Sequence, residues 1–105
     1  MNGADAVPDP GWVPTPIDTT GVELPAELVP LIERLAENAH DNWAELRISE
    51  GWQWGSDTEP AIKRHRLLVP YADLSEQDKE PDRRLAVQTL KLVLYFGFRI
   101  VPGDR

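Results

Sequence analysis

The chain has 105 residues, a net charge of −7 and no cysteine. This length provides for one domain with a small core, and the missing cysteines exclude a disulfide framework and a thiolate zinc site. The acidic balance argues against a nucleic-acid binder, since phosphates require a cationic face. No apolar run reaches the ~20 residues that span a bilayer. We therefore expect a cytoplasmic protein with no nucleic-acid and no membrane partner.

The charge is divided unevenly along the chain. Residues 1–59 carry a charge of −10, whereas residues 60–105 carry +3. This division permits a local anion site on an acidic protein, and it also permits two copies to meet acidic face to basic face.

Residues 1–13 are predicted to form an extended arm, followed by a domain at 14–101 and a polar C-terminal end at 102–105. The first twenty residues are rich in Pro, Gly, Asp and Thr and show no helical or strand period. Their larger apolar side chains include Trp12, Val13 and Ile17. Because an exposed Trp is costly in water, we expect these side chains to dock on the domain or to contact a partner.

Residues 25–49 are predicted to form an amphipathic helix. Its apolar residues recur every three or four positions and so share one stripe; they are Leu28, Leu31, Ile32, Leu35, Ala36, Ala39, Trp43 and Leu46. Pro25 suits a first turn, and Pro30 indicates that the regular helix begins near Val29 after a looser turn. Gly51 is expected to end the helix as its C-terminal cap.

Residues 52–72 change to an extended pattern. Trp52 and Trp54 alternate with the polar Gln53, and a second extended segment runs over residues 64–69. A turn-rich loop at 55–60 separates the two segments. The pattern predicts either a short hairpin or two irregular extended segments.

A second helix is predicted after Ser75. Ser75 and Asp78 have the spacing of an N-terminal cap, and apolar residues continue at helical spacing as far as Gly97. Pro81 is expected to interrupt or restart this helix. The fold class that follows is α+β, with two main α-helices packed with a small β-hairpin or sheet.

The residues of the usual catalytic and metal sites do not come together in this sequence. Only His40 and His65 are available, without a metal-binding spacing, and no serine has the setting of a nucleophile. An acidic row repeats every four residues and is interpreted as a solvated helix face; its members are Glu33, Glu37, Asp41 and Glu45. We expect no catalytic residue, no metal site, no cofactor and no enzymatic activity.

Several unusual strings follow one another in a set order. They are Pro16-Ile17-Asp18-Thr19-Thr20, Leu24-Pro25, Asn38 with His40 and Trp43, Gly51-Trp52-Gln53-Trp54-Gly55, Leu67-Leu68-Val69-Pro70-Tyr71 and Lys79-Glu80-Pro81-Asp82-Arg83. In this order they closely resemble the RyR domain, the ryanodine receptor repeat family, over roughly residues 14–100. The family occurs as tandem pairs in ryanodine-receptor calcium channels, and the chain is similar to its single-repeat, bacterial or phage-type members.

The resemblance implies an α+β domain in which helices flank a small sheet, with a regulatory or interaction role and no catalysis. Family members are also suspected of recognising nucleotide-like small molecules, and the paired repeats of the channels imply that a single repeat can pair with itself. Two departures bear on any ligand preference. Trp54 stands where the family more often has Tyr, and His65-Arg66 stands where it often has His-Pro.

The candidate ligand contacts are aromatic or cationic side chains, each with a structural alternative. They are Trp52, Trp54, His40, Trp43, Arg64, Arg66, Tyr71 and Arg83. The rings either anchor the core or line a slot for a planar ligand ring, and strand alternation places Trp52 and Trp54 on one face. The arginines either belong to solvated charge runs and ion pairs or contact a phosphate.

The leading interpretation is a non-catalytic binding or regulatory module for a nucleotide-like anionic small molecule or a protein partner. The ligand is expected to lie with the face formed by Trp52 and Trp54 on one side of it and the cations Arg64, Arg66 and Arg83 on the other. The alternative is a structural self-assembly domain that forms a homodimer without a ligand.

Overall fold

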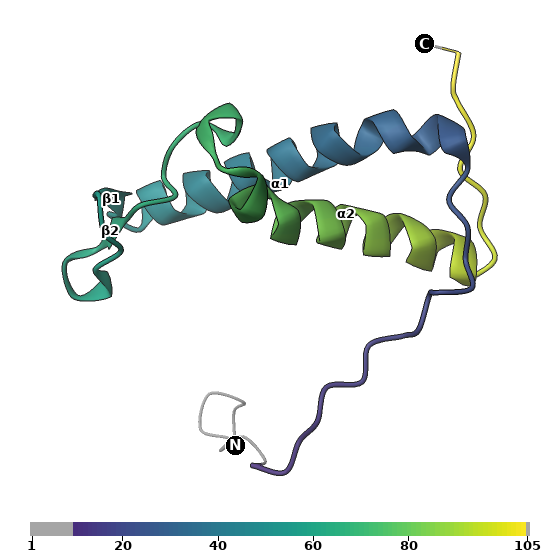
Figure 1. The fold of residues 1–105 in the computed structure, drawn as a ribbon, viewed down its shortest axis with the longest axis horizontal. Helices are drawn as coiled ribbons and strands as arrows, with labels where there is room; N and C mark the ends of the chain where they lie inside the picture. Colours follow the sequence, from purple (N-terminus) through teal and green to yellow (C-terminus); the bar gives the residue numbers. More distant parts are fainter. Residues whose placement is uncertain (1–9, 105) are drawn as a thin grey trace.

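Two long helices and a small parallel sheet make up the protein (Figure 1). The computed structural model describes residues 10–104. Helix α1 (Val29–Ser49) and helix α2 (Glu76–Tyr95) run side by side in opposite directions, and the segment between them carries strands β1 (Gln53–Trp54) and β2 (Arg64–His65). The predicted α+β class is therefore confirmed.

Helix α1 has the boundaries that its prolines and glycine predict. A 3₁₀ turn at Ala26–Leu28 precedes the helix, and Pro30 lies in its first turn, where a missing N–H costs no hydrogen bond. At the other end, Gly51 adopts a φ of 93°, and the amides of Gly51 and Trp52 donate to the carbonyls of Ile48 and Arg47. These two bonds form a Schellman cap, which closes the helix and turns the chain toward β1.

Helix α2 is continuous through its internal proline. Ser75 caps the helix, since its hydroxyl accepts a hydrogen bond from the Asp78 amide at 3.0 Å. Pro81 was expected to interrupt the helix, but it lies near the helix start, where the proline removes one bond to a preceding carbonyl and the turns on either side hold the backbone. A second Schellman cap, with Gly97 at a φ of 91°, ends the helix.

The hairpin alternative for residues 52–72 is wrong, because β1 and β2 pair in parallel. Gln53 lies opposite Arg64 and Trp54 opposite His65. The reversal happens inside the connecting loop, where Glu59 forms an isolated antiparallel bridge with Arg64. Lys63, in the left-handed region with a φ of 54°, then turns the chain so that β2 runs in the same direction as β1.

The core is small and lies where the connecting segment covers the helix pair. Ala36 of α1 is completely buried, and Tyr71 and Leu74 pack against it with Leu67 and Val69. Because alanine has a small side chain, the connecting segment can approach the helix closely at this point. The segment that follows β2 is thus fixed on α1, and this contact positions the residues described below.

Residues 10–13, the part of the predicted arm that the structure describes, do not dock on the domain. Trp12 is 71% exposed and Val13 is exposed as well, while the arm leads away from the helices (Figure 1). Contact with a partner therefore stays as the other interpretation of these side chains. Of the predicted arm, residues 1–9 lie outside the described residues, and so does Arg105 of the polar C-terminal end.

Candidate functional site

A cleft of about 280 Å³ opens between α1, β2 and the first turns of α2. We call it the ring cleft, because two histidines and a tryptophan form its wall. Its lining residues are His40, Trp43, His65, Leu67, Leu74, Asp78, Pro81 and Asp82. Two of the predicted site residues, His40 and Trp43 on α1, line this cleft. A third, Arg66, directly follows the lining residue His65 of β2.

His40 fastens the connecting segment to α1. Its ring is 4% exposed, and Nε2 donates a hydrogen bond to the Val69 carbonyl at 2.7 Å. Because a carbonyl only accepts, this bond places the proton on Nε2. The ring also lies 5.6 Å from that of Trp43 and 6.1 Å from that of Tyr71. His40 therefore has the structural role that its position beside a core tryptophan predicts, and it presents a fixed ring to the cleft.

His65 is the central ring of the cleft. Its centroid lies 4.7 Å from that of Trp43, edge to face, and 5.8 Å from that of Trp52. The Leu67 amide donates to its Nδ1 at 3.1 Å, so the neutral ring carries its proton on Nε2. Partial burial lowers the pKa of His65, and the nearby charges of Arg66 and Arg47 lower it further. At neutral pH the cleft therefore contains an uncharged imidazole with one donor.

The two tryptophans of the Gly-Trp-Gln-Trp-Gly string have different surroundings. Trp52 is half-buried beside His65, and the guanidinium of Arg47 lies 5.9 Å from its ring centroid. Trp54 is 55% exposed. No ring contact joins Trp52 to Trp54 in the described part of the chain. Trp52 thus extends the aromatic cluster behind the ring cleft, whereas Trp54 lies apart from it.

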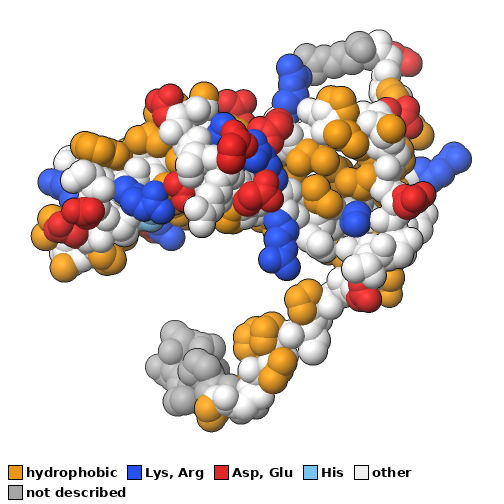
Figure 2. Space-filling view, viewed as in Figure 1, with side chains coloured by type: hydrophobic (Ala, Val, Ile, Leu, Met, Phe, Trp, Pro, Cys, Tyr) orange, Lys and Arg blue, Asp and Glu red, His pale blue; other side chains and the backbone are white. Residues whose placement is uncertain are grey.

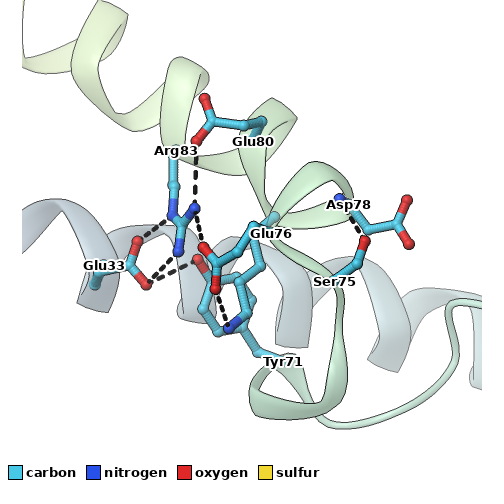
Figure 3. A network of polar contacts seen from close by, with 8 residues as sticks. Glu33, Tyr71, Ser75, Glu76, Asp78, Glu80 and Arg83 are labelled. Carbon is cyan, nitrogen blue, oxygen red and sulfur yellow. Dashed lines mark hydrogen bonds and ion pairs between the residues drawn. The ribbon is translucent and has the colours of Figure 1, made fainter.

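Arg83 is held by carboxylates from both helices (Figure 3). Its guanidinium pairs with Glu33 of α1 and, at 2.7 and 3.3 Å, with Glu76 and Glu80 of α2. Hydrogen bonds to Glu33 and Glu76 raise the pKa of Arg83, and the same contact with Arg83 lowers the pKa of Glu33. Arg83 therefore braces the two helices against each other and has its charge neutralised there.

Tyr71 completes this brace. The phenol donates a hydrogen bond to Glu33 at 3.2 Å, as Figure 3 shows, and the Lys79 ammonium lies 5.2 Å from the ring centroid. Burial raises the pKa of Tyr71, and the neighbouring Glu33 charge adds to this effect. The buried ring and the anchored hydroxyl fix the 3₁₀ turn Tyr71–Asp73 on α1.

Arg66 and Arg64 differ from Arg83 in accessibility and partners. Arg66 donates two hydrogen bonds to Asp78, which lines the ring cleft, at 3.0 and 3.3 Å, and the side chain of Arg66 is half exposed. Arg64 donates to the Ile62 carbonyl, and its side chain crosses Gly55 so closely that a Cβ on Gly55 would lie 2.8 Å from the Cβ of Arg64. The cations thus do not converge on one point.

A family model describes nearly the whole chain: the RyR domain matches residues 12–102. The chain belongs to the RyR domain family. The family strings now have positions in the fold. Asn38, His40 and Trp43 lie along α1, the Leu-Leu-Val-Pro-Tyr string crosses α1, and the Lys-Glu-Pro-Asp-Arg string forms the first turns of α2.

In this RyR domain, the sequence reasoning missed two carboxylates of the site. Glu33 was assigned to the solvated acidic face, yet it joins Tyr71 to Arg83. Its spacing of three from Ala36 and seven from His40 placed it on the same helix face as these buried residues, which is a signal that could have identified it. Asp82 lines the ring cleft, whereas the sequence analysis named it only as part of a family string.

Two further observations bear on partners of the RyR domain. Among residues 10–104, His, Asp and Glu side chains nowhere gather in groups of three that could hold a metal ion. Neither helix of the described part combines the length and the apolar character that a bilayer crossing requires.

Proposed function

We propose that this RyR domain is a non-catalytic recognition module that holds the planar ring of a small, anionic, nucleotide-like molecule in the ring cleft. The observation that supports this proposal most is the convergence of His40, Trp43 and His65 from two elements on one hollow. Ring faces and edges held at fixed positions favour a flat ligand, because stacking requires little reorganisation of the protein.

The dimensions of the ring cleft favour a single ring system. Its volume of about 280 Å³ lies just below the ~300–1,000 Å³ of pockets for drug-sized ligands. Leu67, Leu74 and Pro81 supply apolar contacts, while the Asp82 carboxylate is an acceptor for an amine on the ring. A nucleobase has these features: a flat apolar face and polar groups at its edge.

Arg66 is the cation that fits an anionic group on such a ligand. Its side chain is half exposed and is paired with one carboxylate, that of Asp78, which lines the cleft and is 23% exposed. Because water reaches the Arg66 side of this pair, a phosphate can compete with Asp78 for Arg66. Arg83 is a poorer candidate, because three carboxylates surround it. The proposal thus moves the ligand from the Trp52/Trp54 face to the ring cleft.

The groups that line the cleft supply recognition and no bond-making chemistry. The Nε2 proton of His40 is bonded to a backbone carbonyl, and Nδ1 of His65 accepts from a backbone amide. Covalent catalysis also needs a positioned nucleophile, and no Ser, Thr, Cys or Lys is among the residues that line the cleft. The chain has no cysteine, and Ser75 is engaged in capping α2. This use of the polar groups supports a binding role.

Calorimetric titration with adenosine, AMP, ADP and cyclic AMP tests the proposal. We expect measurable binding of at least one nucleotide and weaker binding of adenosine, since adenosine lacks the phosphate. Arg66→Ala should reduce nucleotide affinity about tenfold, to that of adenosine, because a charge-assisted contact is lost. Arg34→Ala is the matched control: this exposed arginine lies on α1 outside the cleft, and its removal should leave affinity unchanged.

Trp43→Leu separates binding from folding in the same assay. This variant should lose nucleotide and adenosine binding alike, while circular dichroism verifies that it remains folded. The proposal is contradicted if none of the four compounds binds at millimolar concentration. It is also contradicted if Arg66→Ala leaves nucleotide affinity unchanged, or if Arg34→Ala lowers it.

Homodimerisation is the second candidate function, and a separate observation favours it. Large apolar side chains are exposed over much of the described surface, among them Trp12, Leu85, Phe96 and Phe98. Soluble monomers rarely expose contiguous apolar patches of large area. One of these side chains, Leu85, lies in an open groove along α2.

A further inference from the structure

Helix α2 carries an open groove that shares Pro81 with the ring cleft and continues along the helix from there. Two hollows of about 670 and 750 Å³ meet at Arg84, Leu85 and Gln88 and extend along the helix to Gln77 in one direction and Leu92 in the other. Leu85 lies at the junction and is 60% exposed. We call this surface the α2 groove. Its centre is an apolar side chain that the rest of the described chain leaves in water.

The N-terminal arm leaves the domain at one end of the α2 groove. Thr19 is 3% exposed, and its hydroxyl donates a hydrogen bond to the Gln88 side chain at 3.0 Å. Residues 15–20 form the wall of the groove near this anchor. Beyond it the arm extends away from the helices, and Figure 2 shows hydrophobic side chains on the surface of the arm. Each copy of the chain thus has both an exposed Trp12 and an open groove.

The prolines of the arm decide whether that tryptophan can fill the groove of its own chain. Pro14 and Pro16 fix their own φ angles and restrict Val13 and Thr15 to extended conformations. Such a segment is stiff over several residues. Residues 13–16 therefore stay extended, and in the structure the arm leads away from the helices with Trp12 exposed.

A second copy of the chain offers the groove that this arm needs. The first twenty residues contain Asp5, Asp9 and Asp18 and no Lys or Arg. The groove contains Arg84, which makes no ion pair with any described residue, together with the carboxylates of Glu80 and Asp18. Arg84 attracts an acidic arm and the two carboxylates repel it, so the apolar centre of the groove is the part that favours the arm. Because every copy has both parts, the exchange can be reciprocal about a twofold axis.

We infer that two copies of the chain exchange arms, with Trp12 of each copy lying on Pro81 and Leu85 in the α2 groove of the other. A buried Trp removes about 150–250 Å² from water. With Val13 and Pro14 each arm covers roughly 400 Å², so two arms and two grooves bury about 1,600 Å² in all. This is the area of a standard protein–protein interface. The interface shares Pro81 with the ring cleft but is otherwise formed by other residues, and it goes beyond the proposed ligand binding.

Light scattering and sedimentation of the full chain test the inference. We expect a dimer at micromolar concentration. Trp12→Ala and Leu85→Asp should each weaken dimerisation at least about a hundredfold, since each removes the same anchor from both arm–groove contacts. Trp54→Ala is the matched control: its tryptophan is also exposed but lies at the opposite end of the molecule, and the dimer should persist.

Mixing the two variants distinguishes arm exchange from any other dimer. A Trp12→Ala chain has an intact groove, and a Leu85→Asp chain has an intact arm. Together they restore one of the two contacts, so the mixture should form a heterodimer that neither variant forms alone. Circular dichroism verifies the fold of both proteins, and Leu85→Ala replaces Leu85→Asp if the charged variant does not melt cooperatively.

Cross-linking shows which chain contributes the arm. Because the chain has no cysteine, Val13→Cys and Thr89→Cys introduce a single pair, with Thr89 exposed close to Leu85. We expect a disulfide between two chains, with the mass of a dimer. A monomeric wild-type protein, a disulfide within one chain, or a dimer that survives Trp12→Ala and Leu85→Asp overturns the inference.

Discussion

The hydrogen bond between His40 and Val69 should be a major stabilising contact, and substitution of His40 by leucine measures it. Leucine fills most of the space of the ring but cannot donate to the Val69 carbonyl, which loses its partner at 2.7 Å. An unsatisfied polar group in a buried position costs about 1–3 kcal/mol. Domains of this size are stable by about 5–15 kcal/mol, so the loss is a substantial fraction of the total.

We expect His40→Leu to lower the free energy of unfolding by about 2 kcal/mol, and hence the melting temperature by about 8–16 °C. Urea unfolding followed by circular dichroism at pH 7.5 measures the effect. His40→Gln retains a side-chain donor and should lose less. Glu37→Ala, at an exposed position on the same helix, should change stability by less than about 0.5 kcal/mol. The reasoning is refuted if His40→Leu is as stable as the wild type, or if His40→Gln loses as much.

Three further predictions concern the backbone and pH. Gly55→Ala should destabilise the protein by about 1–3 kcal/mol, since the new methyl group meets Arg64, whereas Gly21→Ala, with open space around it, should be neutral in the same urea assay. Ser75→Ala should cost about 1 kcal/mol through loss of the α2 cap, and Ser75→Asp, which can still cap, should cost less. The pKa of His65 is lowered below its ordinary value of 6.5 in the folded protein. The contribution of His65 to stability is therefore complete above about pH 6.5 and is lost as the pH falls through the lower folded-state pKa. His65→Gln should lack this part of the pH dependence, and the same dependence of the urea midpoint on pH in both proteins would contradict the prediction.

The helix boundaries could be predicted from the sequence because local chemistry determines them. Pro25 and Pro30 each restrict a backbone angle within their own turn, Gly51 permits the positive φ that ends the helix, and the structure follows all three. Ser75 acts within a single turn in the same way. Pro81 was misjudged because its cost is local, whereas the packing of α2 along α1 that outweighs it involves the whole helix.

The strand pairing could not be predicted, since it depends on contacts between distant residues. Two strands of two residues each carry no pattern that distinguishes parallel from antiparallel pairing. The direction depends instead on the left-handed turn at Lys63, a residue type that rarely adopts this conformation. The prediction that Trp12 docks on the domain was wrong for a related reason. The apolar character of a side chain predicts that it is buried, but it does not indicate against which surface.

The candidate site could be predicted in its residues better than in its geometry. The family strings identified His40, Trp43 and Tyr71, which the structure brings together around Ala36 and the ring cleft. The ion pair between Glu33 and Arg83 could not be predicted from the sequence. These two residues lie fifty positions apart and meet only because the antiparallel helices pack together.

The measurement that tests the central claim most directly is an NMR titration of the four tryptophan indole N–H signals with AMP. Single Trp→Phe variants assign the signals. A ligand ring in the ring cleft should shift the indole signal of Trp43 most and that of Trp52 less, and should leave those of Trp54 and Trp12 in place. The account is contradicted if no signal moves at millimolar AMP, or if Trp54 shifts while Trp43 does not.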